Sequence, residues 1–231
     1  MTEILSNSSN LLHVSNFQDL ISSPFQGTTN ALSWSRELAG DFEEIVNAFH
    51  FKGTMMEIDE EDLLLLELSE AGHVARETLL SDFKFLSELG ASPVLNIITN
   101  YEADEHPFFP TDVYSFHVDR SPIATDTFLC TYFGDPSELI ANEDAIQKIQ
   151  IPEIREQLLK TYTGKKADFE TYLRENFFDL HYQAIDDARV IQAGVGHLWR
   201  LAVDHPESKV LPCVHRAPKE ASGKKRLLMI C

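Results

Sequence analysis

The part of the chain after Gly90 consists of short apolar runs separated by turn-forming residues, and this pattern constrains the fold more than any other feature. The runs are rich in β-branched, aromatic and leucine residues, whereas Pro, Gly, Asp and Ser stand between them. Such runs are typical of β-strands. Seven of them predict a sandwich or a small barrel: SPVLNIITNY, DVYSFHVD, TDTFLCTYF, ARVIQ, GHLWRLAV, KVLPCVH and KKRLLMIC.

Residues 31–91 have a different, helical pattern. Apolar side chains recur there at spacings of three and four residues, as at Phe42, Ile45 and Val46. Gly90 is a typical helix stop, because glycine readily adopts the left-handed conformation that ends many helices. We therefore expect a layer of helices ahead of the strands.

Two further stretches complete the predicted organisation. Residues 1–30 are rich in Ser, Asn and Thr with weak periodicity, which predicts an irregular lead-in. Residues 92–231 are predicted to form the strand core, interrupted at about 137–181 by a helical insertion in which Pro152 begins a helix. We expect this insertion near the open end of the core, as a candidate lid. With 43% hydrophobic content, the chain fits a single domain spanning residues 1–231.

Acidic side chains outnumber basic ones by 37 to 19, which gives a formal net charge of −18. Such a charge repels phosphate backbones and anionic lipid surfaces, so we expect neither nucleic acid nor membrane as a partner. No apolar run is long enough to predict a membrane span, and the N-terminal stretch lacks the basic start of a signal peptide. Three cysteines without CxxC spacing predict neither a disulfide framework nor a thiolate zinc site. A cytoplasmic protein is expected.

The stretch YSFHVDRSP places His117 two residues before Asp119 within a predicted strand. Side chains two apart on a strand project from the same face, so both could bind one ion, although a polar strand edge has the same pattern. A third ligand is available in LPCVHRAP as His215. Two histidines and one carboxylate form the facial triad that holds non-haem Fe(II) and leaves coordination positions open.

Arg226 follows His215 by eleven residues, on the last predicted strand. Its guanidinium could pair through two hydrogen bonds with the distal carboxylate of a 2-oxo acid that chelates iron through its other end. Thr131 and Tyr132 are further candidates for contact with this cosubstrate, but they alternate along a strand, so only one can face a pocket. Beyond the metal ligands, we expect no catalytic residue. The sequence contains neither a phosphate loop nor a nucleophile elbow.

The order of these residues, HxD, about a hundred residues, His, then Arg, resembles that of the Fe(II)- and 2-oxoglutarate-dependent oxygenases. The resemblance implies a mostly β fold with flanking helices, a double-stranded β-helix or cupin-like jelly roll. It further implies Fe(II), 2-oxoglutarate as cosubstrate, O2, and hydroxylation of a small-molecule substrate. One departure is the pair Gly196-His197, which stands where that superfamily often has an acid.

A closer resemblance covers nearly the whole chain. The blocks NALSWSREL, FHVDRSP, LCTYFGDPSELI, VGHLWRL and HRAP followed by KKRLLMIC are similar to successive blocks of the bacterial domain-of-unknown-function family 1826. The turn TYFGDPSE lacks that family's second glycine, and Asp126-Thr127-Phe128 stands where an Arg-Leu pair is usual. The chain thus resembles a divergent member, and the family implies no activity of its own.

Several residues near these motifs have two interpretations. Trp199, Arg216 and Arg120 are candidates for the substrate pocket. The alternative is a place in the core for Trp199 and salt bridges for the two arginines. His181, His197 and His205 are interpreted as surface or hydrogen-bonded histidines rather than ligands. Two alternative functions also stay open: a jelly roll that binds a metal or senses a ligand, and a cupin-type dioxygenase or isomerase that does not use 2-oxoglutarate. The sequence leaves the oligomeric state undecided.

Overall fold

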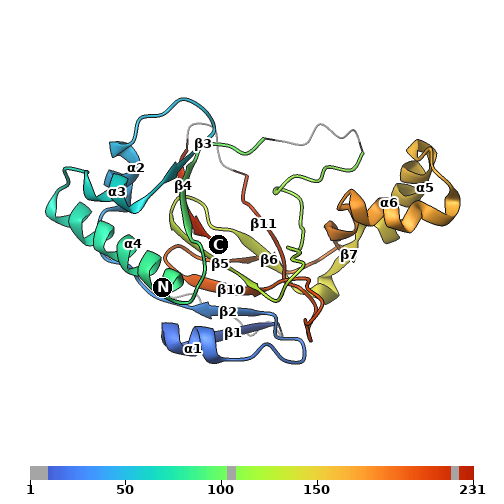
Figure 1. Ribbon diagram of the computed structural model, residues 1–231, viewed down its shortest axis with the longest axis horizontal. Helices are drawn as coiled ribbons and strands as arrows, with labels where there is room; N and C mark the ends of the chain where they lie inside the picture. Colours follow the sequence, from blue (N-terminus) through green and yellow to red (C-terminus); the bar gives the residue numbers. More distant parts are fainter. Residues whose placement is uncertain (1–9, 103–107, 220–223) are drawn as a thin grey trace.

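The structure is a computed structural model that describes residues 10–102, 108–219 and 224–231. It combines helices with a large, mainly antiparallel sheet (Figure 1). Helices cover one face of this sheet, and a layer of shorter strands covers the other. The large sheet remains open and does not close into a barrel.

The large sheet has seven strands, and every neighbouring pair is antiparallel except the first two, β1 and β2. In spatial order they are β1 (Leu11–Val14), β2 (Ala31–Trp34), β10 (Leu198–Ala202), β5 (Asp126–Phe133), β12 (Arg226–Ile230), β4 (Val94–Ile98) and β3 (Met55–Ile58). The central strands β5 and β12 are buried along nearly their whole length, as expected for strands covered on both faces.

Alternation along the strands divides the core into two apolar layers. Leu227 and Met229 of β12 pack in one layer, whereas Leu228 between them packs in the other. The first layer contains side chains from the helices α1 (Phe17–Ser22), α2 (Phe42–Ala48), α3 (Glu60–Leu64) and α4 (Glu70–Glu88). Each of these helices begins at an Asn, Asp or Ser side chain that accepts a backbone N–H of the first turn.

The second layer is built from two small sheets. One contains β11 (Val214–Arg216), β6 (Glu138–Ile140) and β9 (Ile191–Gln192), and the other pairs β7 (Ala145–Gln147) with β8 (Tyr182–Ala184). His117 forms β-bridges with both His215 and His181. The segment around His117 therefore joins the two small sheets edge to edge.

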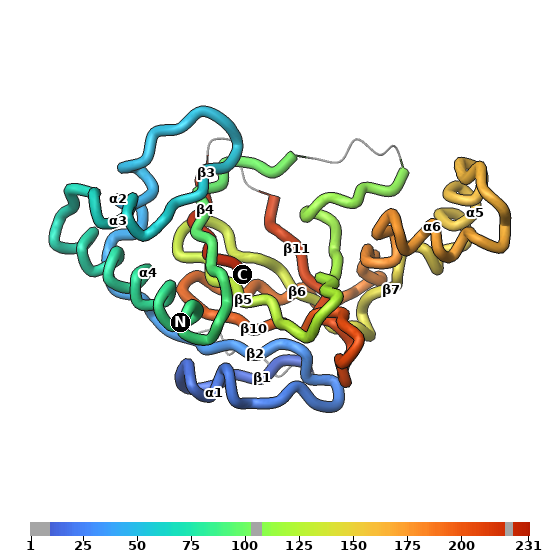
Figure 2. The backbone as a smooth tube through the Cα atoms, viewed as in Figure 1, coloured from blue at the N-terminus to red at the C-terminus, as the bar shows by residue number. Residues whose placement is uncertain are grey.

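A helical arm, residues 148–180, connects β7 to β8. It contains α5 (Pro152–Thr161) and α6 (Phe169–Glu175), together with the short 3-10 helices η2 (Lys148–Gln150), η3 (Lys166–Asp168) and η4 (Phe178–Leu180). The arm projects at the end of the molecule opposite α4 (Figure 2). Its apolar side chains Ile149, Leu158, Phe169, Leu173 and Phe178 form a small separate cluster together with Phe109, which lies outside the arm.

Several of the predicted ranges contain elements other than those expected. The lead-in 1–30, of which residues 1–9 lie outside the described part, contains β1 and α1, while the helical layer 31–91 also holds β2 and β3. The insertion 137–181 begins with two strands, so only the helical arm fits the prediction. These strands are short and complete sheets through distant partners, which a local pattern does not reveal.

The predicted strand DVYSFHVD is a turn followed by isolated bridges. The carboxylate of Asp112 accepts the backbone N–H groups of Tyr114 and Ser115 at 3.1 Å, which holds the first half in a turn. The β-bridges of this run are at His117, which pairs with His215 of β11 and with His181.

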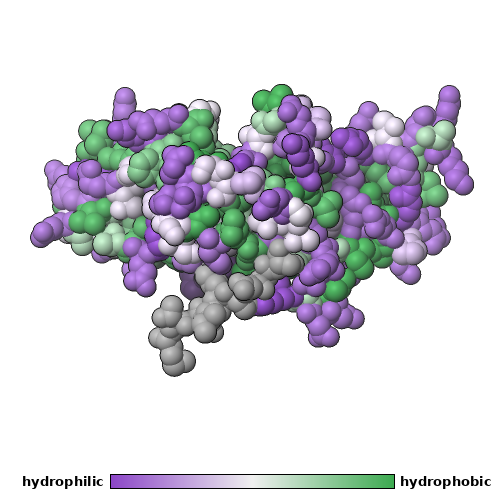
Figure 3. Space-filling view, turned by 90° about the horizontal axis from the view of Figure 1, so that it is seen from below, coloured by the Kyte–Doolittle hydropathy of each residue, from purple (hydrophilic) through white to green (hydrophobic). Residues whose placement is uncertain are grey.

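Hydrophilic side chains are spread over the surface seen from below, interspersed with smaller apolar areas (Figure 3). None of the helices in the described ranges combines the length and the apolar character that a membrane span requires.

Candidate metal centre

His117 and His215 lie directly opposite each other in the second layer. The backbone N–H of each donates to the carbonyl oxygen of the other at 2.9 Å. Residues opposed in this way project from the same face of a sheet. Their imidazole rings accordingly lie together, with centroids 4.6 Å apart.

Backbone carbonyls fix which nitrogen of each ring is available. Nδ1 of His117 lies 2.8 Å from the carbonyl oxygen of Ser115, and Nδ1 of His215 lies 3.2 Å from that of Cys213. A carbonyl can only accept, so each Nδ1 carries the proton and each Nε2 keeps a lone pair. Metal-binding histidines are typically oriented by such a contact.

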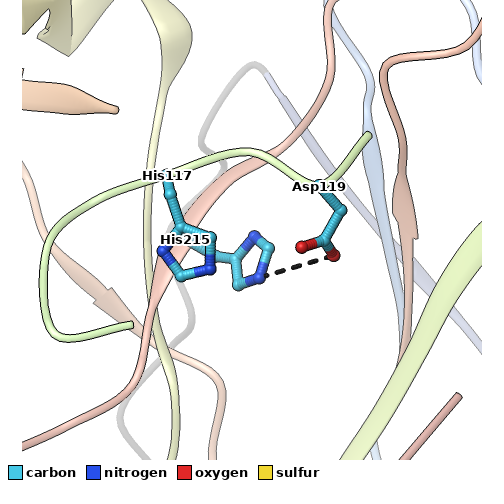
Figure 4. Close-up of side chains that lie close together, drawn as sticks. All are labelled: His117, Asp119 and His215. Carbon is cyan, nitrogen blue, oxygen red and sulfur yellow. Dashed lines mark ion pairs between the residues drawn. The ribbon is translucent and has the colours of Figure 1, made fainter. Parts of the chain in front are cut away.

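Asp119 completes the group from the same segment as His117 (Figure 4). Its Oδ2 lies 3.7 Å from Nε2 of His215 and accepts the hydroxyl of Thr127, in β5 of the large sheet, at 2.5 Å. One ligand atom from each of the three residues lies within 4.8 Å of the others. Nitrogen and oxygen ligands bind metals at about 2.1 Å, so only small adjustments are needed, and the group can hold a metal ion.

The electrostatics of the group favour the protonation states that a metal needs. Burial, followed by the charge of His215, lowers the pKa of His117 to about 4. Burial on its own would raise the pKa of Asp119, but His215 and the hydrogen bond from Thr127 outweigh it, and the pKa is lowered. Near neutral pH, His117 is therefore neutral and Asp119 ionised, as metal ligands must be.

A cavity of about 810 Å³ opens onto His117 and Asp119. Its walls come from three places: the turn that precedes His117, the end of the helical arm, and the loop after β10. Its lining residues are Thr111, Asp112, Val113, His117, Val118, Asp119, Arg120, Ser121, Pro122, Arg174, Phe177, Leu180, His181, Asp204, His205 and Pro206. The candidate metal centre thus has access to a space large enough for a small molecule.

Arg226 lies on the inner face of the large sheet and is 1% exposed. One guanidinium nitrogen donates to the hydroxyls of Thr131 at 3.0 Å and Ser137 at 2.7 Å. Ser137 lies two residues before Leu139, which pairs with His215. The guanidinium of Arg226 therefore lies at the start of β6, the strand that pairs with the strand of His215.

The other predicted site residues are placed differently. Tyr132 faces the helices, where its hydroxyl donates to Asp82 of α4 at 2.5 Å, so its expected cosubstrate contact does not fit this position. Alternation along β5 explains the outcome, since Thr131 takes the inner face and leaves Tyr132 the outer one.

Of the three pocket candidates, only Arg120 lines the cavity, and it is paired with Asp179 at 2.5 Å and with Asp204 at 2.7 Å. Trp199 is fully buried, and its indole donates to the carbonyl of Ala193 at 2.7 Å. Arg216 pairs with Glu138 at 2.6 Å. Neither Trp199 nor Arg216 lines the cavity, because one fills the core and the other points to the opposite side of β11 from His215.

Three residues of the site were missed by the sequence reasoning. Thr127 and Ser137 are ordinary small polar residues, and only the pairing of distant strands brings them to Asp119 and Arg226. His181 is 6% exposed and lines the cavity, with its ring centroid 6.0 Å from that of His117. The face alternation of β5 was the one available signal, because it places Thr127 on the same side as Thr131.

No protein-family model matches the chain, and no curated protein or solved structure shows significant similarity to it. The resemblance to the 2-oxoglutarate-dependent oxygenases and to family 1826 therefore stays a prediction.

Proposed function

We propose that the protein is an Fe(II)- and 2-oxoglutarate-dependent oxygenase that hydroxylates a small molecule. The observation that carries this proposal is the pair of histidines whose Nδ1 atoms are tied to carbonyls beside a carboxylate oriented by Thr127. Two imidazoles and one carboxylate suit non-haem iron and leave coordination positions open.

The arrangement of the two sheet layers is compatible with this proposal. A large sheet faces a second layer of short strands, and the candidate ligands lie in that layer, facing the large sheet. We propose that this arrangement is a distorted double-stranded β-helix, with the helical arm inserted between two strands of the smaller layer. The likeness to a divergent member of family 1826 belongs to the same proposal.

Each part of the site has a separate task under this proposal. His117, Asp119 and His215 would hold Fe(II), and Arg226, oriented by Thr131 and Ser137, would bind the distal carboxylate of 2-oxoglutarate. Together with O2, iron and cosubstrate bound there would supply the oxidising chemistry. The cavity walls would hold the substrate and limit access of bulk water.

The experiment is anaerobic addition of Fe(II) and then 2-oxoglutarate to the metal-free protein. We expect a weak visible charge-transfer band that grows only when both are present, because it requires chelation of iron by the cosubstrate. Tight iron binding without this band would contradict the use of 2-oxoglutarate and leave the metal site intact.

Variants distinguish iron binding from 2-oxoglutarate binding in this experiment. His117→Ala, Asp119→Ala and His215→Ala should each lose most iron binding. Arg226→Ala should still bind iron, but its affinity for 2-oxoglutarate should fall roughly 30-fold. Losing one half of a buried charge-assisted pair costs about 2 kcal/mol or more. Arg226→Lys should restore part of the affinity, since lysine lacks the planar two-pronged contact. Thermal unfolding of each variant checks that the buried site still folds.

A second candidate is a cupin-type metal protein or metalloenzyme, a dioxygenase or isomerase, that needs no 2-oxoglutarate. The observation in its favour is that Arg226 is almost fully buried, already donates to two hydroxyls and does not line the cavity. Undiminished 2-oxoglutarate affinity in Arg226→Ala would support this candidate.

A further inference from the structure

The outer wall of the cavity is formed by the end of the helical arm. Phe177 lies there, directly after α6, and 58% of its surface is exposed although it lines the cavity. Apolar side chains of Val113, Leu180, Pro122 and Pro206 line the same space. The cavity therefore offers an aromatic ring and other apolar groups around the polar metal centre.

The backbone of Phe177 has a φ of +59°, in the left-handed region. Bulky residues rarely adopt this conformation, and glycine or asparagine normally takes it after a helix. Asparagine is in fact the preceding residue, Asn176, with an ordinary negative φ. Since the ring of Phe177 is mostly exposed, packing in the core does not explain why a phenylalanine occupies this left-handed position. Residues held in unfavourable conformations cluster at binding sites, where the side chain has a task.

Arg174 lies three residues before Phe177 and also lines the cavity. Its side chain is exposed, and with the residues that the structure describes its guanidinium forms no hydrogen bond or ion pair. Arg120, in the same cavity, is instead held by Asp179 and Asp204. In a chain of net charge −18, Arg174 is thus a cation available to a ligand at the edge of the cavity.

We propose that the substrate is an aromatic carboxylate, whose ring packs against Phe177 and whose carboxylate pairs with Arg174. Arg174 and Phe177 line the same cavity, so one ligand within it can reach both. The opposite end of such a ligand would then point toward His117 and Asp119. This inference rests on the proposed oxygenase function, and it names the class of substrate.

The test measures binding of phenylacetate to the metal-free protein by NMR titration. Two matched probes serve as controls: phenethyl alcohol lacks the charge, and acetate lacks the ring. Without metal, a carboxylate cannot bind through iron, so the titration reports the cavity walls alone. We expect phenylacetate to bind more tightly than either matched probe.

Two variants assign the contacts. Arg174→Gln should lower the affinity for phenylacetate about fivefold or more and leave the affinity for phenethyl alcohol unchanged. Phe177→Gly should lower the affinity for both aromatic probes by a similar factor. The variant should nevertheless unfold at the same temperature as the parent protein or higher, because glycine adopts the left-handed conformation without strain. Arg189→Gln removes an exposed arginine outside the cavity and should change nothing.

Equal phenylacetate affinity in the parent protein and both variants would overturn the substrate class, as would a failure of phenylacetate to bind. Because no metal is present, these results are independent of the iron experiment. Appearance of the charge-transfer band together with failure of the phenylacetate test would reject only the aromatic carboxylate.

Discussion

At the scale of residues, single hydrogen bonds orient the ligand atoms of the candidate metal centre. The carbonyls of Ser115 and Cys213 hold Nδ1 of each histidine, so both Nε2 atoms are available on the same side. Thr127 holds one oxygen of Asp119 in the same way. These contacts preorganise the ligands, and this lowers the entropy that metal binding must remove.

The metal-free protein should lose stability as the pH falls below about 6.5. Burial and His215 lower the pKa of His117 to about 4, whereas an exposed histidine has a pKa near 6.5. Between these values the unfolded chain takes up a proton that the folded chain does not, so the free energy of unfolding falls by up to about 3 kcal/mol. Urea unfolding of the metal-free protein at several pH values measures the decline.

His117→Gln should reduce this decline, because glutamine does not titrate. His50→Gln, which removes an exposed histidine, is the matched control and should keep the parent pH profile. An unchanged profile in His117→Gln would assign the pH dependence to other groups.

At the scale of elements, α4 is held to the large sheet by a buried polar contact as well as by apolar packing. Asp82, 1% exposed, accepts hydrogen bonds from the guanidinium of Arg36 and from the hydroxyl of Tyr132. Arg36 also donates to the carbonyl of Gly196 at 2.7 Å. The network ties α4, β5 and the loop before β10 together.

Asp82→Asn should destabilise the fold by about 3 kcal/mol. The substitution removes the charge that compensates Arg36, and leaving one buried charge without its partner is costly. Lys84→Ala on the same helix breaks an ion pair with Glu88 that is more than 60% exposed on both sides, and should cost little. Chemical denaturation of both variants gives the comparison, and similar losses for the two would show that the buried pair has no special role.

The molecule as a whole consists of two unequal parts that meet at the candidate metal centre. Each of the two layers packs on the large sheet through an extensive apolar cluster, whereas the helical arm packs in a small separate cluster together with Phe109. Arg120 links the arm to the rest of the molecule by pairing with Asp179 and with Asp204 after β10. Elements with few buried contacts open locally at lower free energy.

Amide hydrogen exchange should therefore be faster in α5 and α6 than in β5 and β12. Arg120→Gln should raise exchange in the arm roughly tenfold, equivalent to about 1.4 kcal/mol, and leave β5 unchanged. Arg155→Gln, which breaks the exposed pair with Glu170 within the arm, is the matched control. Equal exchange in the arm and in β5 would contradict an independently opening arm, and with it the idea of a lid.

Local patterns predicted the strands that are fully buried and the helices with strong periodicity. The runs around β4, β5, β10 and β12 match the observed strands, because a continuous apolar run buried on both faces has a clear signal. The helix that ends near Gly90 was predicted from the three- and four-residue spacing of its apolar side chains. The sequence also determined the three residues His117, Asp119 and His215, whose ligand atoms the fold brings together.

Only the tertiary structure decided how these residues meet. His117 is not on a regular strand, and it lies beside His215 because backbone hydrogen bonds join segments almost a hundred residues apart. The positions of Thr127 and Ser137, and the cavity lined by Phe177 and Arg174, likewise depend on strand pairing and on the packing of the helical arm. Side-chain alternation within one strand is a local property that can be read from the sequence. The partner of each strand depends on burial summed over the whole chain, which no local pattern contains.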